Sequence, residues 1–371
     1  MTVVLGLHAS DTHLRSRLGD EEFAFEQIVD AAISHDVAYV ALAGDLLDKQ
    51  SNRAHVVTFF CEQIERLREH DIPVMYTQGQ HDLDDPPWFS AHKNTVHMHR
   101  RTRECRGIKF YGIDWQPFGK LQQELADIPY STDFLLMHQV WANWMGEVAA
   151  PQGSFEQIPG HISFLHTGDL HQWKLEERKN NAGGTMTVLS TGATTQQKID
   201  EPTQHYYALF LADGSFERKR LRSRVMLDSS LLTQAAELDK FIADLPGLLT
   251  DAAREASVLR LPPALQRPYL RVSFNSNLHD TVRRVERIVK DRAIVTFKQL
   301  IPEEKRQAYA RAKRTDGKAV TPLSVLDEEV NKKDLPRTYE LVARLLQAPD
   351  PEIAFAQWRS EFLGEDTKKG E

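Results

Sequence analysis

The sequence contains few cysteines and no long apolar run. Cys61 and Cys105 are its only cysteines, and they lie far apart in the 371-residue chain, which argues against a disulfide framework or a thiolate metal site. No apolar stretch approaches the roughly 20 residues that cross a bilayer, and the first residues lack a signal-peptide pattern. We therefore expect a cytoplasmic protein (in the host cytoplasm if it is viral) with no membrane partner.

Net positive charge is also lacking. Lys and Arg number 46 against 53 Asp and Glu, so the formal net charge is −7. This charge argues against indiscriminate nucleic-acid binding, although a local basic surface can still contact phosphates. Basic residues cluster at 99–103, 217–224, 283–292 and 305–314. Each cluster has two interpretations, a solvated surface or a set of contacts to a phosphate backbone.

Short apolar runs alternate with amphipathic helical patterns over the first 200 residues. The segment 21–35 places Phe25, Ile28 and Ala32 on one helical face, and 53–70 shows the same period. Strand-like runs occupy 3–9, 37–43, 72–76, 108–114, 133–138, 162–166 and 186–190. This alternation predicts an α/β fold around a largely buried sheet.

The pattern changes after residue 225 and predicts further domains. We expect a first domain over 1–225, a helical connector over 226–265, a small α/β unit over 266–320 and a C-terminal helical segment with a disordered tail over 321–371. Within them we expect a helix at 231–256 that is interrupted near Pro246 and Gly247, a strand at 268–274, a helix at 277–292, a strand at 293–300, and helices at 337–347 and 351–363.

Candidate metal ligands follow five of the predicted strands. They are Asp11 and His13 in "SDTH", Asp45 and Asp48 in "GDLLD", Gln80 and His81 in "GQHD", His138 in "LLMHQ", and Asp169 and His171 in "GDLH". Each motif alone is commonplace in loops, but loops beyond the carboxyl ends of strands converge on one crevice, so the ordered set favours a site. Gly44, Gly79 and Gly168 would let the backbone bend sharply or approach an ion closely. Imidazoles and carboxylates without thiolates suit ions such as Mn²⁺, Fe²⁺ or Zn²⁺, and the ligands are too many for one ion.

These ordered motifs resemble those of the calcineurin-like metallophosphoesterase superfamily. More narrowly, residues 1–210 are similar to the nuclease subunit of SbcCD-type double-strand-break repair complexes, with "KFYGIDW", "FLLMHQ" and "STGATTQQKIDEPTQHYYALFL" at its characteristic segments. The resemblance implies a two-sheet sandwich flanked by helices and a small α/β DNA-capping domain at 266–300. It also implies that DNA is the substrate, that the chain forms a homodimer, and that the C-terminal helices dock an SbcC-like coiled-coil ATPase. Packing of those helices against the chain's own domains is the other interpretation.

The resemblance also implies a role for each candidate residue. One metal would bind Asp11, His13 and His171, with Asp45 bridging to a second metal that binds Gln80, His138 and Asp169. A hydroxide between two ions about 3.5–4 Å apart would attack phosphorus. His81 would protonate or stabilise the leaving oxygen, and Asp48 would orient that imidazole. Asp82 is expected to be a capping or loop residue.

Two positions depart from the family pattern, and both concern the second metal. Gln80 stands where Asn is usual, and Asp169 stands where His is usual. Gln80 keeps the amide oxygen on a longer stem, and Asp169 replaces an imidazole nitrogen with a carboxylate oxygen. We therefore hypothesise a preference for Mn²⁺, or secondarily Mg²⁺, over Zn²⁺. The competing interpretation is a degraded second site that binds metal weakly.

The resemblance therefore implies a two-metal DNA exo- and endonuclease, the nuclease subunit of an ATPase-coupled recombination and repair complex. One alternative is a phosphoesterase for small molecules or proteins, which would not need the C-terminal extension. Another is a catalytically weakened subunit that binds DNA ends as a scaffold. His81 beside Asp48 favours retained chemistry, because a pure binder has no need of a leaving-group acid.

Overall fold

The computed structural model describes residues 2–15, 19–49, 53–117, 119–145, 151–197, 201–275, 277–278 and 280–300. The helices predicted at 337–347 and 351–363 and the basic cluster at 305–314 lie outside the described residues. The described elements belong almost wholly to one of two compact units, Met1–Phe274 with Leu278–Lys298. Among the described helices, none combines the length and apolar character needed to cross a bilayer.

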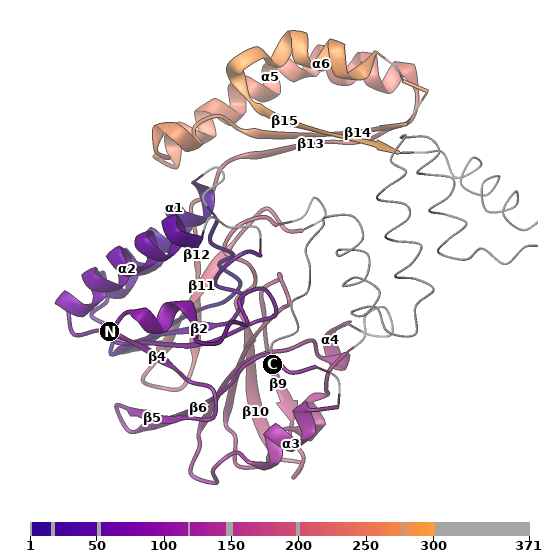
Figure 1. Ribbon diagram of the computed structural model, residues 1–371. Coiled ribbons are helices and arrows are strands. Elements are labelled where there is room, and N and C mark those ends of the chain that lie inside the picture. Colours follow the sequence, from indigo (N-terminus) through magenta and orange to yellow (C-terminus); the bar gives the residue numbers. More distant parts are fainter. Residues whose placement is uncertain are drawn as a thin grey trace, which may run out of the picture. The chain divides into compact units, whose positions relative to one another are not determined.

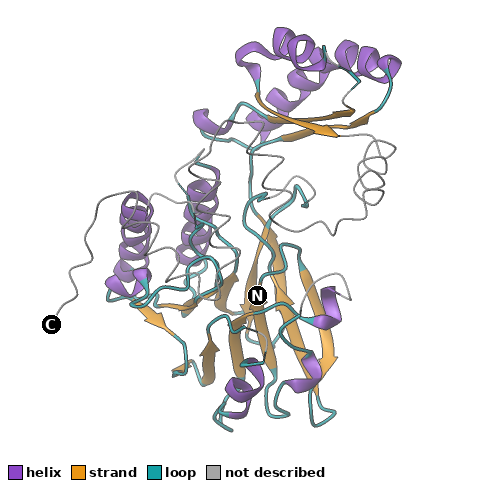
Figure 2. Cartoon of the chain, turned by 45° about the vertical axis from the view of Figure 1, so that its right-hand side comes forward, coloured by secondary structure: helices purple, strands orange, loops and turns teal. Residues whose placement is uncertain are grey.

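The first of two six-stranded sheets has the order β12-β11-β1-β2-β3-β4. Its strands are β1 (Val4–Ala9), β2 (Tyr39–Ala43), β3 (Val74–Thr77), β4 (Thr95–His97), β11 (Tyr206–Leu211) and β12 (Phe216–Arg220). Helices α1 (Asp20–Ser34) and α2 (Arg53–Glu69) lie side by side on one face (Figures 1 and 2). Phe25, Ile28 and Phe60 are buried in the core that the two helices share with the sheet, as their helical spacing predicted.

The second six-stranded sheet has the order β5-β6-β7-β8-β10-β9. Its strands are β5 (Thr102–Cys105), β6 (Ile108–Ile113), β7 (Phe134–His138), β8 (Phe164–Gly168), β9 (Lys174–Lys179) and β10 (Thr185–Ser190). Short helices α3 (Leu121–Ala126) and α4 (Ala142–Met145) accompany it. Tyr39 and Phe210 of the first sheet share a buried cluster with Phe110 and Phe134 of the second. The predicted α/β sandwich of two sheets flanked by helices is confirmed.

Parallel pairing places the ends of five strands where the candidate ligands begin. In the first sheet β1 pairs with β2 and β2 with β3 in parallel, and in the second β7 pairs with β8 in parallel. The carboxyl ends of parallel strands lie along the same edge of a sheet. The loops after β1, β2, β3 and β8, together with the last residue of β7, therefore supply side chains to one region.

A third sheet of three strands follows the sandwich in the chain. It contains β13 (Met226–Leu232), β14 (Tyr269–Asn275) and β15 (Ile294–Leu300), and helices α5 (Ala235–Val258) and α6 (Thr281–Val289) lie along one face (Figure 1). The strands and helix predicted at 268–274, 277–292 and 293–300 are present with shifted ends. The start of the expected helical connector is instead strand β13, which pairs in parallel with β14.

The predicted interruption of the helix at Pro246 is wrong. Helix α5 runs continuously through Pro246. A proline inside a helix costs roughly 3 kcal/mol because it removes a hydrogen bond and crowds the preceding turn. Phe241, Leu245 and Leu249 are buried in the core beneath the helix, and this packing outweighs the local cost.

Candidate metal centre

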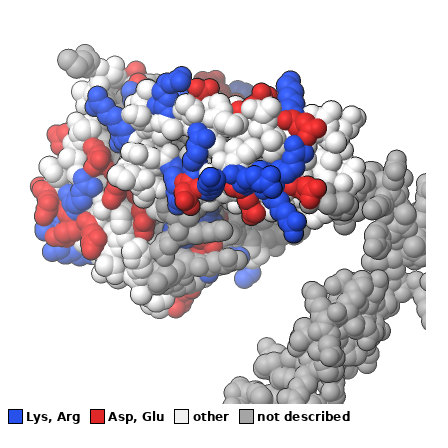
Figure 3. Space-filling model, turned by 90° about the horizontal axis from the view of Figure 1, so that it is seen from above, with Lys and Arg blue, Asp and Glu red and all other residues white. Residues whose placement is uncertain are grey.

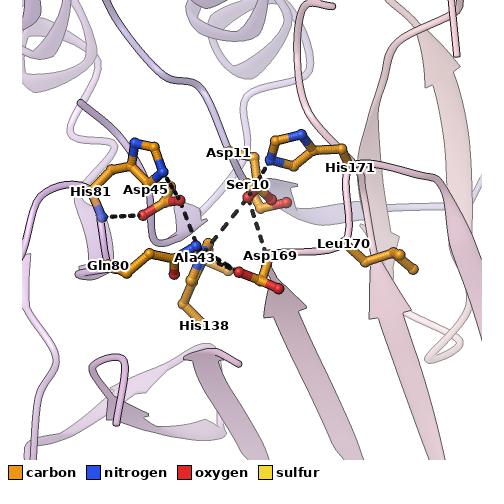
Figure 4. A network of polar contacts seen from close by, with 12 residues as sticks. Ser10, Asp11, Ala43, Asp45, Gln80, His81, His138, Asp169, Leu170 and His171 are labelled. Carbon is orange, nitrogen blue, oxygen red and sulfur yellow. Dashed lines mark hydrogen bonds and ion pairs between the residues drawn. The ribbon is translucent and has the colours of Figure 1, made fainter. Parts of the chain in front are cut away.

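The structure gathers all nine predicted site residues into one cluster. Potential ligand atoms lie within 4.8 Å of one another in three sets: Asp11, His13 and His171; Asp11, Asp45 and His138; and His13, Asp48 and His81. Asp169 joins the cluster because its Oδ1 lies 3.8 Å from His138 Nε2, and Gln80 joins through its amide Nε2, which donates a hydrogen bond to the same oxygen at 2.7 Å (Figure 4). Residues from four loops and the end of β7, spread over 160 positions, thus share one site.

The first set has the spacing that two imidazoles adopt around one cation. His13 Nε2 and His171 Nε2 lie 3.2 Å apart, and His171 Nε2 lies 3.6 Å from Asp11 Oδ1. Two nitrogens each about 2.05 Å from a tetrahedral ion would be about 3.3 Å apart. The three side chains can therefore point their lone pairs at one ion.

Asp45 occupies the centre of the cluster. Its Oδ2 lies 3.4 Å from His138 Nε2 and 3.9 Å from both His13 Nε2 and His81 Nε2. Its Oδ1 accepts a hydrogen bond from the His81 backbone N–H at 2.8 Å. Burial opposes ionisation of this carboxyl, but the neighbouring imidazoles of His138 and His13 outweigh burial and hold its pKa below the usual value.

His138 has one ring nitrogen fixed and the other directed into the site. Its Nδ1 lies 2.8 Å from the Ala43 carbonyl oxygen, so donation there leaves the Nε2 lone pair facing Asp45 and Asp169. Burial would lower the pKa of His138, but the charges of Asp45, Asp11 and Asp169 raise it well above the usual value. These carboxylates create a potential that favours positive charge at the centre.

The residues fit a pair of divalent cations. Asp11 Oδ2, Asp45 Oδ2, Gln80 Oε1 and His138 Nε2 are buried and lack a hydrogen-bond partner. Unpaired buried polar atoms are rare in folded proteins, and several converging on one point are the pattern of a ligand set. The donors are carboxylate and amide oxygens and imidazole nitrogens, which suit divalent ions.

The backbone of the site is held in a sparsely populated conformation. Asp11, His13, Asp45 and Asp169 have positive φ angles of 50°, 41°, 49° and 79°. Residues with a side chain adopt this left-handed region at a cost of about 1 kcal/mol or more, and such residues concentrate at functional sites. Strain at four candidate ligands indicates that the fold constrains these loops to present their side chains.

The comparisons with known proteins agree with this geometry. Residues 7–173 match the calcineurin-like phosphoesterase family. The chain contains a calcineurin-like phosphoesterase domain. The predicted resemblance to that superfamily is confirmed.

Curated relatives of this chain match over part of their length. The DNA double-strand break repair protein Mre11 of Sulfolobus acidocaldarius is 25% identical over 216 residues, 53% of this chain and 56% of that protein. The uncharacterized metallophosphoesterase YhaO of Bacillus subtilis is 28% identical over 253 residues, 59% of this chain and 61% of that protein. Mre11 of Sulfurisphaera tokodaii is 27% identical over 277 residues, 60% and 70% of the two chains. The chain thus spans little more than half of the first two relatives.

Solved structures match this chain at low scores. TT1561 of Thermus thermophilus aligns with a TM-score of 0.40 and 20% identity, covering 60% of this chain and all of that one. A dimetal phosphatase from Danio rerio aligns with a TM-score of 0.38 and 9% identity, covering 56% and 93%. These scores are too low to indicate an activity.

Two glycines of the phosphoesterase loops lie against the ligands. Gly44 has a φ of 73°, and a Cβ there would lie 2.6 Å from the His138 ring. A Cβ on Gly79 would lie 2.1 Å from Asp45 Oδ1. Gly44 thus has the left-handed conformation of a sharp bend, and both glycines approach ligand side chains closely. Their approach to an ion stays a prediction.

Asp82 fastens two ligand loops of the phosphoesterase domain together. Its Oδ2 accepts from the backbone N–H of Leu46 at 2.7 Å and of Leu47 at 3.4 Å, and its Oδ1 accepts from Gly79 N–H at 2.7 Å. The prediction of a capping or loop residue is confirmed. Burial and the charge of Asp45 raise the pKa of Asp82 to about 7 against the effect of these backbone hydrogen bonds.

His81 and Asp48 lie at the more open side of the site. The His81 side chain is 31% exposed, and its Nδ1 is a buried atom without a hydrogen-bond partner. Asp48 Oδ2 accepts from Arg15 at 3.3 Å, an ion pair that the sequence did not reveal. The orientation of His81 by Asp48 stays a prediction, consistent with their ligand atoms lying within 4.8 Å.

Glu201 is a neighbour of the site that the sequence patterns did not single out. Its Oε1 lies 2.6 Å from His171 Nδ1, although it follows no candidate-ligand strand. The only sequence signal was its position inside the segment "STGATTQQKIDEPTQHYYALFL".

Replacing Asp82 tests whether its hydrogen bonds hold the loops after β2 and β3 together. We expect Asp82→Ala to lower the free energy of unfolding by about 2 kcal/mol or more, because buried N–H groups of Leu46 and Gly79 lose their acceptor. Denaturant unfolding would measure this, with Asp85→Ala as the control, since Asp85 is exposed on the same loop. Equal unfolding free energies for the two variants would contradict the fastening role.

Proposed function

We propose that this protein is a two-metal-dependent DNA nuclease that hydrolyses phosphodiester bonds as the nuclease subunit of an ATPase-coupled recombination and repair complex. The observation that carries the proposal is a cluster of buried side-chain oxygen and nitrogen atoms around Asp45 that lack hydrogen-bond partners, within a phosphoesterase domain. Similarity to Mre11 proteins, which are named for DNA double-strand break repair, supports DNA as the substrate.

The proposal gives each predicted residue a role at the two metals. Asp11, His13 and His171 would hold one cation, Gln80, His138 and Asp169 the other, and Asp45 both. Bound divalent cations would supply Lewis acidity and lower the pKa of water between them. Because Asp45 is anchored by the His81 N–H through one oxygen, its other oxygen keeps a fixed position between the two sets.

His81 is proposed as the residue that serves the leaving group. It is 31% exposed at the site, whereas His138 is fully buried, so His81 is the imidazole that a bound phosphodiester can reach. An imidazole there can donate a proton to the leaving oxygen or stabilise its charge. Asp48 is proposed to orient it.

Contacts to the DNA backbone are proposed for the exposed members of the basic clusters. Seen from above α5 and α6, Lys and Arg are interspersed with Asp and Glu (Figure 3). Arg284 pairs with Asp239 and Arg100 with Glu124, which supports the solvated-surface interpretation for these residues. Arg283 and Arg287 of α6 are exposed and are the better candidates for phosphate contacts.

The remaining parts of the proposal follow from the family resemblance. They are the DNA-capping role of the unit at 266–320, the helical segment at 321–371 as the dock for an SbcC-like ATPase, and the homodimer. The domain limits at 225 and 265 and the cytoplasmic location are proposed from the sequence patterns instead.

A phosphoesterase for small molecules or proteins is the second candidate. It is favoured by the similarity to a metallophosphoesterase whose name specifies no DNA substrate, at 28% identity against 27% for the Mre11 protein of Sulfurisphaera tokodaii. The scaffold alternative is favoured by the Gln80–Asp169 hydrogen bond, because that pair partly satisfies itself without metal.

A cleavage assay separates these functions. We expect linear DNA to be cleaved with Mn²⁺ and not with EDTA, and His81→Ala to lower turnover by about 10²–10⁴-fold while metal stoichiometry is unchanged. His35→Ala, at an exposed histidine that ends α1, is the control. Hydrolysis of p-nitrophenyl phosphate or its diester without DNA cleavage would favour the second candidate, and no hydrolysis of either would favour the scaffold.

The donors of the second metal predict its ion preference. Asp45, Gln80 and Asp169 offer oxygens and His138 one nitrogen, so we expect two Mn²⁺ ions per chain by calorimetry, activation by Mn²⁺ or Mg²⁺, and poor activation by Zn²⁺. The double variant Gln80→Asn with Asp169→His should tighten Zn²⁺ binding relative to Mn²⁺. Zn²⁺ as the best activator of the unaltered protein would contradict the preference, and one ion per chain would indicate a degraded second site.

A further inference from the structure

We infer that Glu201 is a positioning residue whose carboxylate holds the His171 imidazole in the orientation that a cation at the first metal set requires. The inference rests on the metal binding in the proposed function and adds a residue outside the predicted ligand set. The positioning effect is assigned to the carboxylate group of Glu201 and not to the backbone around it.

Both carboxylate oxygens of Glu201 have a partner. Oε1 accepts from His171 Nδ1 at 2.6 Å, and Oε2 accepts from the Gln197 backbone N–H at 2.6 Å. The side chains of Glu201 and His171 are only 11% and 16% exposed. A charge-assisted hydrogen bond shielded from water in this way is short and strong, so it restricts rotation of the ring.

This hydrogen bond decides which ring nitrogen faces the site. With the proton on Nδ1 and donated to Glu201, the lone pair belongs to Nε2, which lies 3.2 Å from His13 Nε2 and 3.6 Å from Asp11 Oδ1. A carboxylate partner also makes the liganding nitrogen more basic. Glu201 therefore favours the tautomer and the direction that a metal ligand needs.

The two sets of ligands differ in this respect. His138 has the neutral Ala43 carbonyl as its Nδ1 partner, whereas His171 has a carboxylate. Removal of the Glu201 carboxylate should accordingly weaken one metal site and leave the other unchanged.

The segment that carries Glu201 is also tied to the site through its backbone. Gln196 Nε2 donates to the Glu201 carbonyl oxygen at 3.3 Å, and Thr194 N–H donates to the Asp11 carbonyl oxygen at 3.3 Å. A variant that loosens this segment but keeps the carboxylate therefore separates positioning from mere support of the loop. Gln196→Ala is that variant.

Calorimetric titration of the full chain with Mn²⁺ alone tests the inference. We expect Glu201→Ala to weaken one of two Mn²⁺ sites by about 10–100-fold and to leave the other unchanged. Glu201→Gln keeps the shape and one acceptor oxygen, so it should show a smaller loss at the same site. Gln196→Ala should leave both affinities near those of the unaltered protein, and thermal melting checks that each variant is folded.

Several results would overturn the inference. They are unchanged Mn²⁺ affinity in Glu201→Ala, an equal loss at both sites, or a loss in Gln196→Ala as large as in Glu201→Ala. Should Glu201→Ala fail to fold, unchanged affinity in Glu201→Gln overturns it instead. A protein that binds Mn²⁺ as expected in all variants but cleaves no DNA would overturn the proposed nuclease and leave the role of Glu201 intact.

Discussion

The position of the Asp45 carboxylate is the constraint on which the rest of the site depends. One oxygen is fixed by the His81 N–H, and the other faces His13, His81 and His138 from the centre of the cluster. Its neighbourhood admits no side chain at position 79, where a Cβ would collide with it. The ligands from both sheets are arranged around this one group.

Holding that group in place costs free energy that the rest of the fold offsets. Four ligand residues adopt left-handed backbone conformations, and several buried oxygen and nitrogen atoms of the ligand side chains lack hydrogen-bond partners. The two packed sheets and the α1–α2 layer give the loops a rigid base, and Asp82 joins the loops after β2 and β3. Two bound cations would satisfy the unpaired ligand atoms, and binding would require little rearrangement because the loops already hold these atoms in place.

The site could be predicted from the sequence because parallel strands impose a simple rule. Ligand types that follow strand after strand must meet at one edge of the sheets, so Asp11, Asp45 and His138 could be grouped without coordinates. Glu201 could not, since it does not directly follow a predicted strand and its contact with His171 depends on the tertiary fold. Asp48 could be placed near His81, but its pairing with Arg15 depends on how two loops approach each other.

The secondary structure could be predicted where the apolar periodicity was strong, and the prediction failed where that periodicity was weak. Strands β9 and β12 read "KLEERK" and "FERKR", and their charged residues concealed two edge strands of the sheets. In α5 the packing of one apolar face overrode the local signal of Pro246.

Anomalous X-ray scattering from crystals grown with Mn²⁺ tests the central claim most directly. The account predicts two anomalous peaks about 3.5–4 Å apart, one on either side of the Asp45 carboxylate. A single peak, or peaks that do not share Asp45 as a ligand, would contradict it.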